Sequence, residues 1–298
     1  MTGVTCFHAT IIFLLLLHGT IGEVSDLSPV VLVLSKGRSG SSWMCVDIIP
    51  SLKPGTPPLD EEILGRGEEN VIALPNPLEV AQLYLQKRRL LCPNKTIGFK
   101  WKPAPPTSTH HDELMKWVHE NDFPVVHNHR NPLDLVLSVL KHRSDLELFS
   151  HCKTKECVDR HKNIRVQVNI TRMLEHMHRS INEHAERNMQ LTRFGIRFID
   201  VYYDDLIYAA DERRLSTLQS LIDFIYPNEG IIGTLSNLDS SQIEITTEYD
   251  HSKLILNFDE VVEALRGTSF EKYIHVGPAP NSRANTTTAK RRRIRRRS

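Results

Sequence analysis

The stretch Val30-Val-Leu-Val-Leu34-Ser-Lys-Gly-Arg38-Ser-Gly-Ser-Ser-Trp43 decides the fold that we predict for this chain. Its first five residues are aliphatic, which predicts a strand buried on both faces, as in a parallel sheet. A loop of glycines, hydroxyl residues and cations follows, and residues 41–49 have the pattern of a helix. A strand, a small-residue loop and a helix N-terminus together form an anion-binding cradle, because backbone N–H groups and the helix dipole face one point.

The loop has the residues that such a cradle needs. Gly37 and Gly40 let the backbone approach a ligand closely, while Lys36 and Arg38 supply positive charge. It is not a Walker A loop, because no lysine follows Gly40. Taken alone, the loop is equally compatible with an ordinary glycine-rich turn.

A second motif, Phe123-Pro-Val-Val-His-Asn-His-Arg130-Asn-Pro-Leu-Asp-Leu-Val-Leu-Ser138, again predicts a strand and then a helix. Residues 125–129 form the strand, and Asn131 is suited to cap the helix, with Pro132 in its first turn. One helical face is apolar, and we expect the other, with Asp134, Ser138 and Lys141, to lie on the non-core side. Arg130 at the strand end is a candidate phosphate ligand because its fork binds phosphate bidentately; a surface arginine is the alternative.

Together the two motifs resemble those of sulfotransferases that use 3′-phosphoadenosine-5′-phosphosulfate, most closely the Golgi carbohydrate enzymes. That family has an Arg-Ser-Gly-Ser-Ser loop for the 5′-phosphosulfate, here residues 38–42. It binds the 3′-phosphate with Arg-[Asp/Asn]-Pro and a serine eight residues after the arginine, the spacing of Arg130 and Ser138. Val201-Tyr-Tyr-Asp-Asp-Leu206 and residues 257–272 also resemble later family segments, so the resemblance covers about residues 30–273.

The resemblance implies a P-loop-like, three-layer α/β fold with a central parallel sheet flanked by helices. It implies in-line transfer of a sulfuryl group to a hydroxyl or amine, with a glycan as the leading acceptor and adenosine 3′,5′-bisphosphate as the product, without a metal. Arg38 would stabilise the leaving group, and Lys100 the sulfuryl group unless it is an exposed strand lysine. The residues expected to bind the cofactor are Lys36, Gly37, Arg38, Ser39, Gly40, Ser41, Ser42, Trp43, Arg130 and Ser138, with Trp43 stacked near the adenine or packed in the core.

The general base that an acceptor hydroxyl needs is not identified by the sequence. His110 and His111 follow the strand that carries Lys100 and are the nearest candidates. His127 and His129 alternate along their strand, and we expect one of them to face the core. The C-terminal Arg-Lys-Gly cofactor motif of the cytosolic enzymes is not evident, which disfavours the small-phenol class.

Strands alternate with helices along the chain, which predicts a parallel sheet covered on both faces, with ligands outside the carboxyl ends of the strands. Further strands are expected at residues 96–101 and 197–202. Further helices are expected at residues 78–91, 112–121, 131–143, 160–190 and 212–225.

The charge of the chain is unevenly distributed. Its 298 residues have a formal net charge of +1, but residues 290–297 contain seven cations and the rest carries −6. We therefore expect one sulfotransferase domain at residues 28–275 and a disordered basic tail at 276–298, with attraction to acidic polysaccharide or membrane as a functional alternative. No nucleic-acid partner is expected, and the oligomeric state is left open.

The N-terminal apolar run at residues 9–17 predicts a signal peptide or a short signal-anchor within residues 1–22. Three N-x-[ST] sequons, at Asn94, Asn169 and Asn285, also favour the secretory route, with the Golgi lumen or membrane as the expected location and secretion as the alternative. Cys152 and Cys157 are close enough for a small disulfide. Zinc at these cysteines is disfavoured because no second ligand pair follows at a suitable spacing.

Three other functions stay open. Sulfation of a peptide tyrosine or of a small alcohol would use the same cofactor site. A P-loop kinase is disfavoured by the absent Gly-Lys-Ser/Thr and by the lack of an evident Walker B strand. A silent nucleotide-binding protein is disfavoured by the presence of Arg38, Arg130 and Ser138.

Overall fold

The computed structural model describes residues 28–36, 39–53, 55–59, 76–101, 111–144, 156, 159–160, 163–227 and 248–280. The predicted signal segment, residues 281–298 of the predicted basic tail, Cys152 and Cys157 lie outside these ranges, as do Gly37 and Arg38 of the cradle. No helix among the described residues is both long and apolar enough to cross a membrane.

A four-stranded, all-parallel sheet lies at the centre of the described structure and confirms the α/β prediction. Its strands are β1 (Val30–Ser35), β2 (Ile97–Trp101), β3 (Val125–His129) and β4 (Phe198–Tyr202), in the spatial order β2-β1-β3-β4. Leu34 pairs with His127, and Ser35 with Asn128. The carboxyl ends of β1 and β3 therefore adjoin at one edge of the sheet, where both predicted anion motifs begin.

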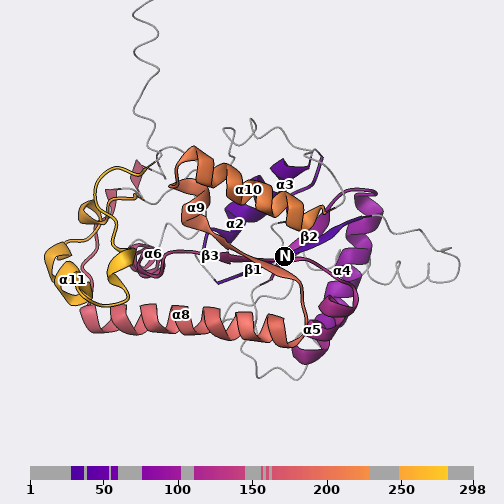
Figure 1. Ribbon diagram of the computed structural model, residues 1–298, viewed down its shortest axis with the longest axis horizontal. Coiled ribbons are helices and arrows are strands. Elements are labelled where there is room, and N and C mark those ends of the chain that lie inside the picture. The colour runs from indigo at the N-terminus through magenta and orange to yellow at the C-terminus, as the bar shows by residue number, and fades with distance from the viewer. Residues whose placement is uncertain are drawn as a thin grey trace, which may run out of the picture.

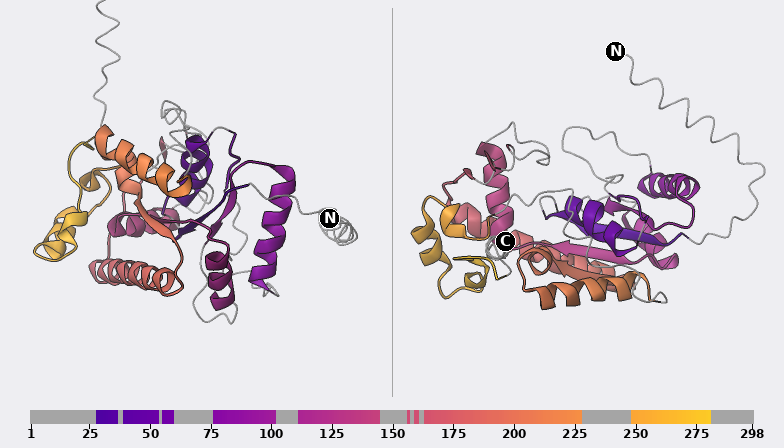
Figure 2. Two further views of the ribbon diagram at one scale, coloured as in Figure 1. Left: turned by 45° about the vertical axis from the view of Figure 1, so that its right-hand side comes forward. Right: turned by 90° about the horizontal axis from the view of Figure 1, so that it is seen from above.

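Helices cover both faces of the sheet, which makes the fold three-layered (Figures 1 and 2). One face packs against α4 (Pro77–Leu91), α5 (His111–Glu120) and the C-terminal part of α8 (Ile170–Arg193). The other packs against the helical stretch after the cradle and against α10 (Asp211–Ile225). Alternating side chains of β1 enter the two cores, as the period of two in a strand requires.

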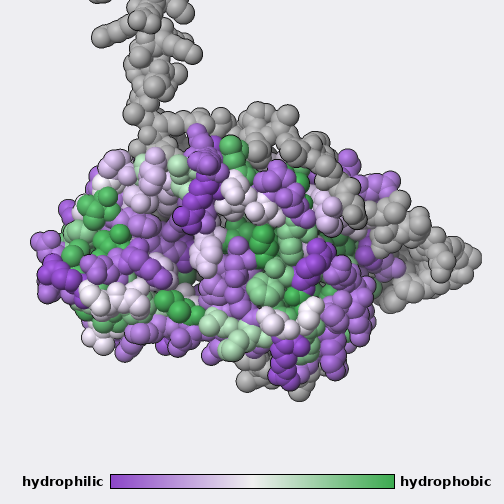
Figure 3. Space-filling view, viewed as in Figure 1, coloured by the Kyte–Doolittle hydropathy of each residue, from purple (hydrophilic) through white to green (hydrophobic). Residues whose placement is uncertain are grey.

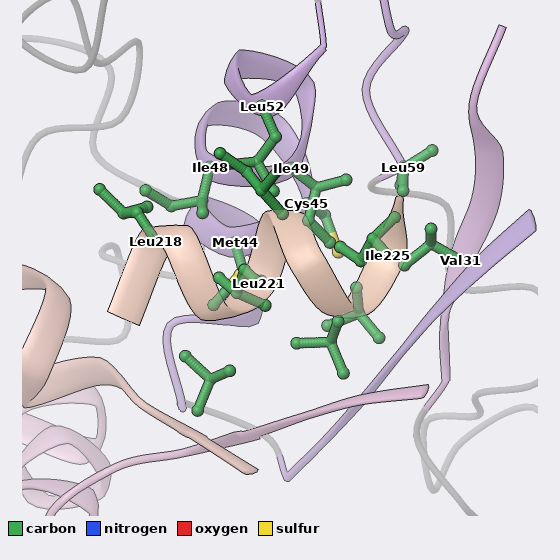
Figure 4. Packing of buried hydrophobic residues seen from close by; sticks show 14 of the residues in the cluster. Val31, Met44, Cys45, Ile48, Ile49, Leu52, Leu59, Leu218, Leu221 and Ile225 are labelled. Carbon is green, nitrogen blue, oxygen red and sulfur yellow. The ribbon is translucent and has the colours of Figure 1, made fainter. Parts of the chain in front are cut away.

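The helix after the cradle is continuous but irregular. It consists of α2 (Ser41–Trp43), a π-helical turn η1 (Met44–Ile48) and α3 (Ile49–Leu52). Its apolar side chains interlock with Leu218, Leu221 and Ile225 of α10 above Val31 of β1 (Figure 4). This packing anchors the cradle on the sheet, because buried side chains of this size each contribute about 1.5–3 kcal/mol.

The long helix begins ten residues later than expected from its periodicity. Residues 164–169 are extended, with Val166 bridged to Ile255, and the Asn169 side chain accepts from the backbone N–H of Arg172 to cap α8 at its start. The prediction of a helix from residue 160 was therefore wrong. Pairing with a segment almost ninety residues away overrides local helical propensity.

The prediction that Asp134 and Lys141 lie on an outward, non-core face of their helix was also wrong. On helix α6 (Pro132–Ser144), Asp134 is 1% exposed and Lys141 2% exposed, while Ser138 is half-buried. The C-terminal segment 248–280 covers this side of the molecule. It contains the turn η4 (His251–Lys253), helix α11 (Phe258–Leu265) and the turn η5 (Glu271–Tyr273).

The remaining elements are short or on the surface. Helix α9 (Tyr203–Ile207) follows β4 directly. Polar residues cover most of the face seen in Figure 3, with smaller hydrophobic areas between them.

Candidate functional site

The cradle is fixed to the sheet from both sides of β1. From β3, the Asn128 amide donates to the Ser39 carbonyl at 2.9 Å and to the Ser39 hydroxyl at 3.3 Å. From β2, the Lys100 ammonium donates to the Ser42 hydroxyl at 3.2 Å. Lys100 is 6% exposed, so the exposed-lysine interpretation was wrong and the strand does direct this cation toward the cradle.

One aromatic ring connects the cradle with Arg130. Gly40 has φ +80°, and a Cβ added there would lie 2.3 Å from the Tyr203 ring, so only glycine fits. The Arg130 guanidinium lies 5.0 Å from the centroid of the same ring. Tyr203 belongs to α9, within the segment that resembles a later family motif. Two motifs far apart in the sequence thus meet on one side chain.

Both motifs open into a cavity of about 410 Å³ between the strand ends and α8. Lys36, Arg130 and Arg187 contribute positive charge to its lining, and Glu183 and Asp204 contribute carboxyl groups. The Lys36 ammonium pairs with Glu183 of α8 at 2.6 Å and so spans the cavity from β1 to α8. A cavity of this size with several cations can accept a phosphorylated ligand.

The other predicted cofactor residues take different positions. The side chains of Ser39, Ser41 and Ser42 are buried at the start of the helix. Trp43 packs edge-on against Tyr203 at 5.7 Å between ring centroids, in contact with the core. Ser138 is two turns beyond Arg130 on α6 and is not among the residues that line the cavity. His111 begins α5, and His110 lies outside the described residues.

A buried ionic cluster adjoins the site and centres on Asp134. Its carboxylate accepts from His251 Nε2 at 2.9 Å and lies 3.9 Å from Arg130 Nε. The backbone N–H of His275 donates to His251 Nδ1 at 3.0 Å, so both ring nitrogens of His251 are used. The hydrogen bond from His251 and the charge of Arg130 outweigh burial and lower the pKa of Asp134.

A second cluster forms where α8 crosses β3 and β4. It comprises His127, His129, His184 and Asp200, whose donor atoms lie within 4.8 Å of one another. Asp200 Oδ1 is 2.6 Å from His129 Nε2, 3.2 Å from His127 Nδ1 and 3.7 Å from His184 Nε2. The three histidines line the cavity, together with Asn188.

The expectation that one of His127 and His129 faces the core was wrong. Residues two apart on a strand share a face, and both side chains contact Asp200 on the side covered by α8. Burial lowers the pKa of His127 and brings the pKa of His129 to about 4. Hydrogen bonds from the histidines outweigh burial and lower the pKa of Asp200. At neutral pH this part of the cavity wall therefore holds uncharged His127 and His129 beside a carboxylate.

The pKa of Asp204 is shifted in the opposite direction from that of Asp200. Burial, reinforced by the negative charge of Asp134, raises the pKa of Asp204 to about 7. Its Oδ1 atom is buried without a hydrogen-bond partner. A carboxyl group of this kind in the cavity wall can present a proton to an anionic ligand near neutral pH.

Sequence reasoning missed His184, Asn188, Asp200 and Asp204 as site residues. The spacing of His184 and Asn188 places them on one helical face, but nothing local indicates that this face meets β3. Only the register of β4 against β3, which pairs Asp200 with His127, brings the carboxylate to the histidines.

The comparisons with known proteins give no relative on which to base a function. No family model matches the chain, and neither a curated protein nor a solved structure is similar to it. The site must therefore be interpreted from its own geometry and chemistry.

Proposed function

We propose that the chain is a sulfotransferase. It would transfer the sulfuryl group of 3′-phosphoadenosine-5′-phosphosulfate to a hydroxyl or amine of an acceptor, with a glycan as the leading acceptor class, and release adenosine 3′,5′-bisphosphate.

The observation that carries the proposal is the meeting of the cradle and Arg130 on Tyr203. A donor with phosphate groups at both its 3′ and 5′ positions needs two anion sites on one rigid support. Gly40 and Arg130 both contact the Tyr203 ring, and Asn128 joins β3 to the cradle by hydrogen bonds. The 5′-phosphosulfate would lie at the cradle and the 3′-phosphate at Arg130.

The reaction requires little from the protein beyond positioning and positive charge. The acceptor atom forms a bond to sulfur and releases its proton to a base, as the bond from sulfur to the bridging oxygen breaks and negative charge accumulates on that oxygen. Fixed N–H groups and cations that face this oxygen stabilise the transition state. Lys100, whose ammonium donates to the Ser42 hydroxyl, is one such cation. Arg38 is assigned to the leaving group by the resemblance alone.

The acceptor has a candidate entrance beside the nucleotide cavity. A smaller cavity of about 150 Å³ lies between α6 and α8 and shares Lys36, Pro132, Leu135 and Ser180 with the larger one. Its remaining lining combines apolar side chains with amide and guanidinium groups, such as Gln167, Asn169 and Arg172. Polar donors on an apolar wall suit a sugar, which presents hydroxyl groups and C–H faces together.

Calorimetric titration of the purified chain tests the cofactor class. Adenosine 3′,5′-bisphosphate should bind without added metal and more tightly than adenosine 5′-phosphate or ATP with magnesium. Transfer of labelled sulfate from the donor to a panel of glycans then tests the reaction. Preference for ATP with magnesium would replace the sulfotransferase with a kinase, and binding of no nucleotide would overturn both.

A further inference from the structure

We propose that His127, His129, His184 and Asp200 form a binding site for a divalent transition-metal ion, with Zn²⁺ as the best-matched ion. The inference concerns the imidazole wall of the cavity and does not depend on the identity of the nucleotide.

The fold brings the four side chains together by simple periodicities. His127 and His129 are two apart on β3, so they share a face. Asp200 is the direct partner of His127 in the parallel pairing of β3 with β4, which puts its carboxylate on the same face. Helix α8 crosses this face and contributes His184, with Asn188 four residues later on the same side. Three separate elements thus converge on one point.

The ligand atoms already lie close together. Asp200 Oδ1 lies 2.6, 3.2 and 3.7 Å from one nitrogen of each imidazole. The rings of His129 and His184 are stacked with centroids 3.5 Å apart and planes at 11°. A tetrahedral ion with bonds of about 2.0–2.2 Å needs its ligands about 3.4 Å apart. The widest separation of 4.8 Å must contract, and the shortest of 2.6 Å must lengthen. One of the two stacked rings must also turn so that both nitrogens face one ion, and we assign this rotation to His184, the more exposed of the two.

The ligand set selects the class of ion. Three imidazoles and one carboxylate, without thiolate, suit Zn²⁺ and its neighbours in the first transition row, whereas Mg²⁺ and Ca²⁺ prefer oxygen ligands throughout. Asn188 supplies an outer contact, because its amide donates to Asp200 Oδ2 at 2.8 Å and leaves Oδ1 for the ion. Its carbonyl oxygen accepts from His127 Nδ1 at 2.8 Å in the metal-free chain, and coordination through Nδ1 would replace that hydrogen bond. Such outer-shell partners orient metal ligands.

A hydrogen-bonded catalytic pair of His129 and Asp200 explains less of the geometry. A histidine base needs one carboxylate to orient it and no further imidazole. Here three imidazoles surround one carboxylate, and all three line the cavity, while Asp200 is 29% exposed and His184 26% exposed. An ion from solvent can therefore reach the site, where the three imidazoles and the carboxylate would fill a tetrahedral set of four ligands.

Metal titration of the full chain, freed of any affinity tag and treated with a chelator, tests the inference. Calorimetry with Zn²⁺ should give one site per chain, a thermal midpoint that rises with Zn²⁺, and no comparable effect of Mg²⁺. Co²⁺ should give the visible absorption of a tetrahedral nitrogen and oxygen site. His184→Ala should weaken Zn²⁺ binding by more than the roughly 10–100-fold typical of losing an outer-shell partner, and Asn188→Ala by about that factor.

The matched control is His176→Ala, which removes an exposed histidine of the same helix outside the cluster and should leave Zn²⁺ affinity unchanged. Absence of stoichiometric Zn²⁺ binding, or binding indifferent to His184→Ala and Asp200→Asn in variants with unaltered circular dichroism, would overturn the inference. Bisphosphate titration of the same samples separates the two proposals: a chain that binds nucleotide but no Zn²⁺ refutes only the metal site, and one that binds Zn²⁺ but no nucleotide refutes only the sulfotransferase.

Discussion

Two aspartates of this molecule have similar partners and opposite surroundings. Asp134 and Asp200 each accept a hydrogen bond from a histidine. Asp134 is 1% exposed, and its histidine partner is also bound by the backbone of the C-terminal segment. Asp200 is 29% exposed and faces three imidazoles that line a cavity. The aspartate–histidine pair at Asp134 therefore holds two parts of the chain together, whereas the pair at Asp200 leaves its ligand atoms accessible from the cavity.

The two clusters differ in whether water or an ion can replace the hydrogen bonds of the aspartate. At Asp134, loss of the carboxylate would remove the buried acceptor of His251 Nε2 and the negative charge that faces Arg130, and no solvent can take their place. At Asp200, solvent or an ion can replace each hydrogen bond, because the histidines meet the cavity. Arg130 belongs to both regions, since it pairs with Asp134 and lines the cavity. Four predictions test this contrast, beginning with the largest effect.

Removal of the buried Asp134 carboxylate should cause the largest loss of stability. Asp134→Ala removes the acceptor of the buried His251 Nε2 and the carboxylate that faces Arg130 at 3.9 Å, and we expect a loss of about 3–5 kcal/mol in the free energy of unfolding. Urea denaturation measures it. A loss below about 1 kcal/mol would mean that the C-terminal segment is not held through this carboxylate.

Removal of Arg130, which belongs to both regions, should weaken nucleotide binding. Arg130→Ala should weaken adenosine 3′,5′-bisphosphate binding by roughly 1.5–3 kcal/mol, as for a lost hydrogen bond to a charged group, while adenosine 5′-phosphate binding changes little. Calorimetry with both nucleotides measures the difference, and Arg266→Ala, which removes an exposed pair with Glu263, is the control. A variant that still discriminates between the two nucleotides would move the 3′-phosphate site elsewhere.

Removal of the negative charge of Asp200, which faces the cavity, should cause a smaller loss of stability. Asp200→Asn keeps the shape and an acceptor atom, but it weakens charged hydrogen bonds from buried histidines, so we expect a loss of about 1–2 kcal/mol in the free energy of unfolding. The urea midpoint of the metal-free protein measures it. If the cost equals that of Asp134→Ala, the two clusters do not differ in the way that their exposure indicates.

The pH dependence of nucleotide binding should give the smallest effect. The pKa of Asp204 is raised to about 7, and a bound phosphate nearby would favour its protonated form further. Binding then takes up a proton, so the contribution of Asp204 to affinity is present below pH 7 and is lost as the pH rises through that value. Calorimetry from pH 6 to 8 should show this loss in the native chain, and Asp204→Asn should remove it while retaining the titration of the nucleotide itself.

Much of the fold was predictable because its signals are local. The aliphatic run at residues 30–34, the Asn131 cap and the apolar faces of the helices each act within a few residues, and β1, β3, α4 and α6 occur within one or two residues of their expected bounds. The adjacency of the cradle and Arg130 also followed from the rule that ligands bind at the carboxyl ends of parallel strands.

By itself, the sequence determined the alternation of strands and helices, the glycine-rich turn after β1 and the arginine at the end of β3, because periodicity and capping depend on neighbours along the chain. Only the tertiary structure decided the start of α8, the burial of Asp134 and Lys141, and the gathering of three histidines around Asp200. These features depend on strand register and on the packing of segments far apart in the sequence, such as Val166 with Ile255. A side chain's neighbours in space determine whether it is a buried support or an accessible ligand.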